Sequence, residues 1–368
     1  MTDADARIAG TLLAIAAVLS MASCGGSGGG GAAGEAPPVG VAAAQQMVFM
    51  YWPAGRGQPV GPDTPYEVAV MNLDGTNLRQ LTSDGKQKFL PHFSPDGTRI
   101  LYTRFAVGGY GSSNATTDVA VLDFASGRET LITSGGINGY GTWSPDGSRI
   151  AYLRNARLGN VPGPISLMIA GVDGSNPRAV GTASETPDDW VWGDIAWSSD
   201  NWILFVVGEL ANGTFCKSRL DKIRPDGTSR TRVSDGGPDC TPPNKESIGD
   251  ADPGWSNDGK TIYSSRGLPA SPAGPQAAVS GVSERKLFAF SSDAWTPGKF
   301  ERDLSLPAQP DCVEGVPKGS PDGKRILLFR VCFDSGVPTS GIYVTDATGD
   351  YRKFVIEGFG PDWNPVAR

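Results

Sequence analysis

The sequence predicts an all-β fold, a six-bladed β-propeller of four-stranded antiparallel blades, and three observations lead to this prediction. The 368 residues include 50 glycines and 29 prolines, a composition that favours many turns over long helices. One short turn motif recurs along the chain. The C-terminal residues repeat the beginning of this motif, so the end of the chain offers a strand that the first repeat lacks.

The turn motif is an aromatic residue followed by Ser-Pro-Asp-Gly, with small variations between copies. Proline presets φ at the first turn position, aspartate caps backbone amides, and glycine takes the left-handed conformation. We interpret each copy as the turn of a β-hairpin. The copies are 93–97, 143–147, 197–201, 255–259 and 319–323, with a truncated copy at 363–365. An apolar strand follows each complete copy, at 99–104, 149–154, 202–207, 261–266 and 325–330.

A second pattern, two strands around a short turn that is often Asp-Gly, alternates with the first. Its copies are 68–82, 119–133, 167–182, 218–234, 286–305 and 342–356. The two patterns together give six units of four strands. The domain opens on the second strand of a unit, at 47–52, so we expect residues 361–366 to supply the missing first strand and close the ring.

These repeats resemble the TolB-type, WD-like propeller repeat, in which Trp-Ser-Pro-Asp-Gly hairpins precede strands such as Arg-Ile-Ala-Tyr (149–152). The resemblance covers residues 46–368 and implies a β-propeller. It does not include the separate N-terminal α/β domain that TolB carries. Propellers serve many functions, so the resemblance by itself assigns none.

The N-terminus predicts export. Residues 8–22 are an uncharged apolar run, shorter than the roughly 20 residues that a membrane-spanning helix needs, and typical of a signal peptide. Met21-Ala22-Ser23 before Cys24 resembles the lipobox of bacterial lipoproteins, in which the cysteine is lipidated. An ordinary secretory signal or an uncleaved anchor is the alternative. We therefore expect a signal peptide at 1–23, a flexible Gly/Ala-rich tether at 24–45 and the propeller at 46–368.

These features also predict where the protein resides and what it contacts. We expect a protein lipid-anchored in the bacterial cell envelope, facing the periplasm or the cell surface, and touching the membrane through its anchor only. Gly25, directly after the lipidated cysteine, favours the outer membrane. The net charge of −7, with scattered Lys and Arg, argues against a nucleic-acid surface. We expect a monomer without a cofactor, whose partner is an envelope protein or a glycan.

The recurrent residues have structural explanations. The motif aspartates belong to separate turns, so we expect turn caps and no catalytic carboxylate pair; they are Asp96, Asp146, Asp200, Asp258 and Asp322. The motif tryptophans should pack between blades; they are Trp143, Trp197, Trp255 and Trp363. A single histidine, His92, cannot build a multi-histidine metal site, and no Gly-x-Ser-x-Gly nucleophile elbow lies at a strand-to-helix turn. We therefore predict neither catalytic nor metal-binding residues.

Four cysteines suit disulfides in an exported domain. Cys312 and Cys332 lie equally far from the turn at Asp322, so they should face each other across two strand ends. Cys216 and Cys240 flank the strand pair that turns at 225–227. Four cysteines allow three pairings, and we expect 216–240 and 312–332.

The two faces of the predicted propeller differ. One carries only short turns, and the other carries the long loops 53–65, 105–117, 155–164, 183–193, 235–253, 267–285 and 306–317. Because function concentrates on loops held by a rigid scaffold, we expect binding at the long-loop face.

The binding candidates lie within 183–193 and are Asp188, Asp189, Trp190 and Trp192. Two indoles and two carboxylates suit a sugar ring or a partner protein, whereas the alternative is that both rings pack inward. With Asp250 and Asp252 the carboxylates offer oxygen ligands for Ca²⁺, but their spacing matches no calcium loop. The sequence thus predicts a non-catalytic binding scaffold. A propeller-type hydrolase or lyase, and a purely structural envelope part, are the alternatives.

Overall fold

The computed structural model describes residues 45–52, 65–109, 114–154, 165–180, 189–211, 214–236, 248–267, 285–305, 312–332 and 339–366. The lipidation candidate Cys24 and the tether lie outside these residues. Within them, all regular structure is β, and no helix is long and apolar enough to cross a membrane.

The described strands fall into six groups of four, which we call blades 1 to 6. Blade 1 contains β24 (Phe359–Trp363), β1 (Gln46–Tyr51), β2 (Glu67–Asn72) and β3 (Arg79–Gln80). Blade 2 contains β4 (Lys88–Phe93), β5 (Arg99–Val107), β6 (Thr116–Asp123) and β7 (Glu129–Leu131). Blade 3 contains β8 (Asn138–Trp143), β9 (Arg149–Arg154), β10 (Ser166–Gly171) and β11 (Arg178–Ala179).

The remaining blades follow the same plan. Blade 4 contains β12 (Asp189–Trp197), β13 (Ile203–Ala211), β14 (Thr214–Ile223) and β15 (Thr231–Arg232). Blade 5 contains β16 (Ile248–Trp255), β17 (Thr261–Gly267), β18 (Arg285–Ser291) and β19 (Glu301–Asp303). Blade 6 contains β20 (Cys312–Gly319), β21 (Arg325–Cys332), β22 (Thr339–Asp346) and β23 (Lys353–Ile356).

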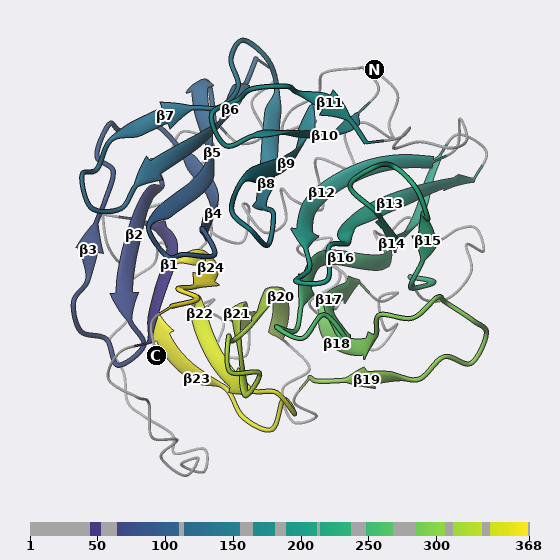
Figure 1. Cartoon of the computed structure of the whole chain (residues 1–368). Coiled ribbons are helices and arrows are strands. Elements are labelled where there is room, and N and C mark those ends of the chain that lie inside the picture. Colours follow the sequence, from purple (N-terminus) through teal and green to yellow (C-terminus); the bar gives the residue numbers. More distant parts are fainter. Residues whose placement is uncertain are drawn as a thin grey trace.

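Each blade is an antiparallel meander, which confirms the predicted fold class. Blades 4 and 5 are additionally joined into one eight-stranded sheet, because Lys217 and Ser218 of β14 pair in parallel with Ile248 and Gly249 of β16. The first strands of the blades, β4, β8, β12, β16, β20 and β24, contact one another in succession and form a closed inner ring (Figure 1).

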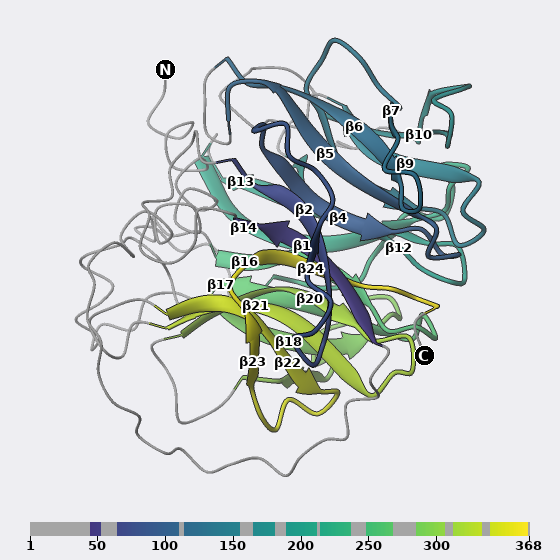
Figure 2. The ribbon, with the colours of Figure 1, turned by 90° about the vertical axis from the view of Figure 1, so that its left-hand side faces the viewer.

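The C-terminal strand closes the ring, as predicted. β24 pairs antiparallel with β1, with Met47 opposite Trp363 and Met50 opposite Phe359. The two ends of the described chain therefore share one sheet, and β1 and β24 lie side by side in both views (Figures 1 and 2). This pairing leaves no open sheet edge between the first and last repeats.

The turn motif folds as its chemistry predicts. In blade 3, Ser144 donates to the carboxylate of Asp146 at 2.6 Å, and the amide of Ser148 donates to the same oxygen at 3.0 Å. Gly147 completes the turn with a φ of 67°. The corresponding serine–aspartate bonds are Ser94–Asp96, Ser198–Asp200, Ser256–Asp258 and Ser320–Asp322. The bonds from Ser144 and Ser148 lower the pKa of Asp146 to about 2.

Several predicted loops are shorter than expected, and this corrects the sequence analysis. Strand β12 begins at Asp189, within the predicted loop 183–193, and β16 and β20 begin at Ile248 and Cys312. Asp189 pairs with Glu209 and Trp190 with Gly208, so ladder pairing continues through residues whose polarity suggests a loop. The β5 and β6 strands likewise extend into 105–117 at both ends.

Candidate functional site

A backbone bulge interrupts the inner strands just before the motif aromatic. The pairing register shifts between Phe89 and His92, and in the same place in β8, β12, β16 and β20. Left-handed φ angles occur there at Leu90 (48°), Tyr140 (54°), Asp252 (49°) and Val316 (53°). This conformation is unusual for non-glycine residues, and above all for a β-branched one. Bulges of this kind redirect side chains, here in the strands that surround the centre of the ring.

A cavity of about 300 Å³ lies at the end of the inner ring where the Ser-Pro-Asp-Gly turns are, and we call it the channel mouth. All six blades contribute to it. Its lining includes the turn residues Pro95, Pro145, Ser199, Asn257, Pro321 and Pro365, which we call the rim, the mostly buried rings of Trp143, Trp197, Trp255 and Trp363, which we call the walls, and His92, Thr142, Ala196, Lys318 and Asp362, which we call the floor.

Three of the wall tryptophans are fixed by bonds between blades. The indole nitrogens of Trp143, Trp255 and Trp363 donate to the backbone carbonyls of His92, Ala196 and Lys318, each in the preceding blade of the ring. Trp197 instead donates to Asn201 in its own turn. The walls of the channel mouth are therefore held rigidly, as a preformed binding surface requires.

The floor carries a buried ion pair that spans non-adjacent blades. The ammonium of Lys318, in blade 6, lies 3.0 Å from Asp194, in blade 4. Burial alone would lower the pKa of Lys318, but the carboxylates of Asp194, Asp362 and Asp252 outweigh burial and raise it above the usual value. Lys318 is therefore protonated at neutral pH, and its amine is not available as a nucleophile.

A second polar contact completes the floor. Nδ1 of His92, in blade 2, lies 3.3 Å from a carboxylate oxygen of Asp362, in blade 1. The lining of the channel mouth thus combines prolines and the edges of indole rings with the charged side chains of Lys318 and Asp362. Such a surface suits a polypeptide segment that places apolar groups against the walls and a polar group at the floor.

The structure places the predicted binding residues differently from the sequence analysis. Trp190 and Trp192 belong to strand β12 and pair with Gly208 and Val206, so they are not in a loop. Their side chains, that of Asp189 and all of Asp188 lie outside the described residues.

The other predicted site residues are partly described. Cys312 and Cys332 are paired in register and their sulfurs form a disulfide. The side chain of Cys216 and all of Cys240 lie outside the described residues.

The carboxylates considered for calcium have protein partners. Asp250 accepts two bonds from Arg266, at 2.8 and 3.0 Å, and Asp252 accepts a bond from Ser265 at 2.6 Å. Over the described ranges, no group of three or more His, Cys, Asp or Glu side chains is arranged to hold a metal ion.

The floor residues Lys318 and Asp362, and the Lys318 partner Asp194, were not predicted from the sequence. One signal for them exists. Proline occurs two positions before the end of four inner strands, at Pro91, Pro253, Pro317 and Pro361. Proline inside a strand indicates a bulge, and a bulge indicates a redirected side chain.

Comparisons with known proteins agree with this fold. The chain is 33% identical over 91 residues to the Tol-Pal system protein TolB of Alcanivorax borkumensis, a match that covers 24% of this chain and 19% of that protein. It is 29% identical over 135 residues to TolB of Francisella tularensis, which covers 37% and 27%. The matched segments thus span less than a third of these relatives. No family model matches.

Solved structures match over a larger part of the chain. TolB of Acinetobacter baumannii has a TM-score of 0.57 at 17% identity, covering 88% of this chain and 67% of that one. A putative TolB of Agrobacterium tumefaciens has a TM-score of 0.53 at 15% identity, covering 86% and 90%. Hydrazine synthase of Kuenenia stuttgartiensis reaches 0.58 at 14% identity, covering 88% and 48%, so the fold occurs with very different functions. The chain therefore has the β-propeller fold that these solved TolB structures share.

Proposed function

We propose that the protein is a non-catalytic lipoprotein of the bacterial cell envelope whose propeller binds a partner at the channel mouth. In this proposal residues 1–23 are the signal peptide, Cys24 carries the lipid and 24–45 tether the propeller. The partner is an envelope protein or a glycan. Partial similarity to TolB, a protein named for the Tol-Pal system, favours a protein partner.

The channel mouth is the observation that carries this proposal. Tryptophans from four blades, three of them bonded to a neighbouring blade, surround a floor on which Lys318 is already neutralised by Asp194. A cavity whose lining is already fixed by such bonds loses little freedom when a partner enters it, and this supports binding there. The protonated Lys318 argues against amine catalysis there.

The long-loop face, with Asp188, Asp189, Trp190 and Trp192, stays a second candidate surface for the same function. One experiment distinguishes the channel mouth from the long-loop face. Full-length tagged protein is crosslinked in envelopes and isolated, and the amount of the co-isolated partner is compared between variants.

Asn257→Trp should fill the channel mouth and reduce partner recovery about tenfold, because Asn257 is exposed at its rim. Leu131→Trp, on the outer strand β7, is the control and should change nothing. Loss of the partner only in a Trp190→Ala/Trp192→Ala variant that melts normally would move the site to the long-loop face. Equal recovery in all variants would contradict both sites.

A further inference from the structure

Consecutive blades meet at seams, and three seams contain the same arginine–tryptophan pair. The guanidinium of an arginine at the start of the second strand lies over the indole of the next blade. The pairs are Arg99 over Trp143 at 4.9 Å, Arg149 over Trp197 at 5.3 Å and Arg325 over Trp363 at 5.8 Å. Cation–π contacts of this kind stabilise the packing between blades.

The seam between blades 2 and 3 shows what the arginine does there. Besides covering Trp143, Arg99 donates from Nη2 to the carbonyl of Gly147, the turn glycine of blade 3, at 3.3 Å. Gly147 is buried, with Arg99 and Pro95 both close to it. The guanidinium therefore fills the outer part of the seam and binds its far wall.

The seam between blades 5 and 6 lacks both members of the pair. Thr261 takes the place of Arg99, since each donates its amide to the motif serine, Ser256 or Ser94, at 2.9 Å. Gly319 takes the place of Trp143, since each pairs with an isoleucine at the start of the following strand.

Tyr263 partly replaces the missing indole. Its ring carbon Cε2 lies 3.0 Å from where a Cβ on Gly319 would be, so the tyrosine has taken that space. In the seam between blades 2 and 3, Leu101 occupies the corresponding position of the second strand. The Thr261 side chain is too short to cross the seam as Arg99 does, and Arg302 of β19 crosses it elsewhere, where it donates to the carbonyl of Ala347.

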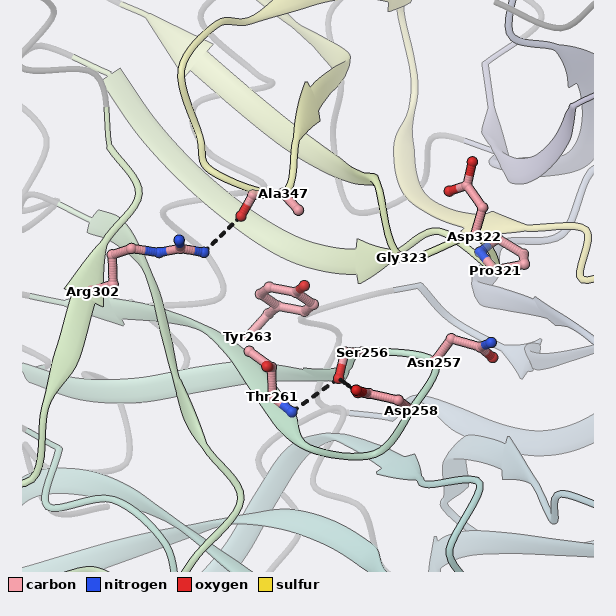
Figure 3. A pocket seen from close by; sticks show the side chains of 10 residues that line it. All are labelled: Ser256, Asn257, Asp258, Thr261, Tyr263, Arg302, Pro321, Asp322, Gly323 and Ala347. Atoms are coloured by element: carbon pink, nitrogen blue, oxygen red, sulfur yellow. Dashed lines mark hydrogen bonds between the residues drawn. The ribbon is translucent and has the colours of Figure 1, made fainter.

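A cavity of about 390 Å³ remains in this seam, and we call it the seam pocket (Figure 3). It is lined by Asp258, Thr261, Tyr263, Arg302, Asp322 and Gly323, among others. Figure 3 shows Tyr263 between the two turns that carry Asp258 and Asp322.

The two turn glycines show the contrast between filled and open seams. Arg99 Nη2 lies 3.6 Å from a Cβ built on Gly147, whereas no atom lies within 4 Å of a Cβ built on Gly323. Gly323 is also exposed, whereas Gly147 is buried.

Two carboxylates and one guanidinium line the seam pocket. Asp258 accepts hydrogen bonds from Ser256 and the Lys260 amide, which lower its pKa, whereas Asp322 lies 3.6 Å from the guanidinium of Arg325. The one guanidinium among the lining side chains, Arg302, donates across the seam to the carbonyl of Ala347 at 2.7 Å. The seam pocket also adjoins the channel mouth, because Ser256, Asn257 and Pro321 line both.

We propose that the seam pocket binds the guanidinium of an arginine side chain supplied by the partner. The guanidinium lies over the ring of Tyr263, donates to the carbonyl of Gly323 and faces Asp258, as Arg99 does for Trp143 and Gly147 within the chain. This proposal rests on the proposed function, since the partner segment at the channel mouth delivers the arginine to the adjoining seam.

In the test, N-acetyl-arginine amide is the probe and is titrated into the full-length protein. The NMR chemical shift of the Gly323 amide reports binding. We expect saturable binding with a Kd on the order of millimolar, as for a single side chain. N-acetyl-citrulline amide has nearly the same shape without the charge and should bind at least about tenfold more weakly.

Thr261→Arg is the decisive variant, because its own side chain should occupy the seam pocket and weaken probe binding at least about tenfold. Leu131→Arg adds the same charge on β7 and should bind the probe like the unmodified chain. If Thr261→Arg does not fold, Asp258→Asn serves instead and should weaken binding about threefold.

Equal affinity for arginine and citrulline probes, or unchanged affinity in the folded variant, would overturn the proposal. The outcome is separable from that of the proposed function. Probe binding without partner capture at the channel mouth contradicts only the proposed function. If the unmodified chain does not bind the probe, and Thr261→Arg captures the partner as well as the unmodified chain does, only the seam-pocket proposal is contradicted.

Discussion

The indole nitrogen of Trp363 donates to the backbone carbonyl of Lys318 at 2.7 Å, and this bond joins strand β24 of blade 1 to blade 6. The same strand pairs with β1, so residues at the two ends of the described chain meet at one point of the ring. The closure is therefore both a sheet pairing and a seam contact, and it depends on the final residues of the chain.

Deleting residues 359–368 should consequently destabilise the whole domain. The deletion exposes the edge of β1 and removes the buried Trp363 ring, which lies in a core cluster with Met47 and Phe49. We expect a loss of several kcal/mol out of the roughly 5–15 typical of a domain, or aggregation. Urea denaturation followed by tryptophan fluorescence measures it, and a cooperative transition at the original midpoint would contradict the closure.

The seam between blades 5 and 6 should gain stability when the missing arginine is restored. Thr261→Arg adds a cation over Tyr263 and a donor for the Gly323 carbonyl, so we expect an increase of about 0.5–1 kcal/mol.

The reciprocal change, Arg99→Thr, should open the seam between blades 2 and 3 and lower stability by about 1 kcal/mol, because it removes the contacts to Trp143 and Gly147. Chemical denaturation of both variants is the measurement. A destabilised but folded Thr261→Arg would show that the two seams are not equivalent.

The Lys318–Asp194 pair should show strong coupling. Lys318→Met leaves the Asp194 carboxylate, only 2% exposed, without its ammonium partner, and should cost about 3–5 kcal/mol. Lys318→Met combined with Asp194→Asn should cost much less than the sum of the single changes. A double-mutant cycle of unfolding free energies tests this, and additive costs would mean that the pair does not act as a unit.

Acid should weaken the turns in a defined range. The folded-state pKa of Asp146 is about 2, below the ordinary value of 3.8, because Ser144 and Ser148 donate to the ionised form. A lowered folded pKa contributes stability above pH 3.8, and this contribution is lost as the pH falls from 3.8 towards 2.

Ser144→Ala removes one of these bonds and should raise the pKa of Asp146, as an NMR titration of its carboxyl carbon would reveal. Asp146→Asn should flatten the dependence of the melting temperature on pH in the same range. If the pKa of Asp146 is unchanged in Ser144→Ala, the bond from Ser144 is not what lowers it.

The proposed lipid anchor at Cys24 has its own test. Cys24→Ala should abolish labelling by a clickable fatty acid and release the protein from the membrane fraction. The propeller should melt as before, because Cys24 lies outside it. Unchanged labelling of the variant would contradict lipidation at this residue.

The fold was predictable because its signals are local. Each Ser-Pro-Asp-Gly turn specifies its own hairpin by the conformational preferences of proline, aspartate and glycine, and repetition of the hairpins specifies the ring. The start of β12 was mispredicted because Asp189 and Gly193 suggest a loop, whereas pairing with β13 extends the strand through them.

The candidate site was less predictable for a physical reason. Lys318 and Asp194 belong to blades that are not neighbours, and only closure of the ring brings them to 3.0 Å. No local pattern specifies that meeting. The seam pocket, in contrast, is visible in the repeat itself, because Thr261 and Gly319 stand where three other copies have arginine and four have tryptophan.

Site-specific photo-crosslinking tests binding at the channel mouth most directly. A photoreactive amino acid replaces Asn257 at the rim, or Leu131 on the outer strand β7, in the full-length protein within its own envelope. We predict one discrete adduct from position 257 and none from position 131. The adduct from position 257 should disappear when Ser199→Trp fills the channel mouth. Adducts of equal yield from both positions, or from position 131 alone, would contradict binding at the channel mouth.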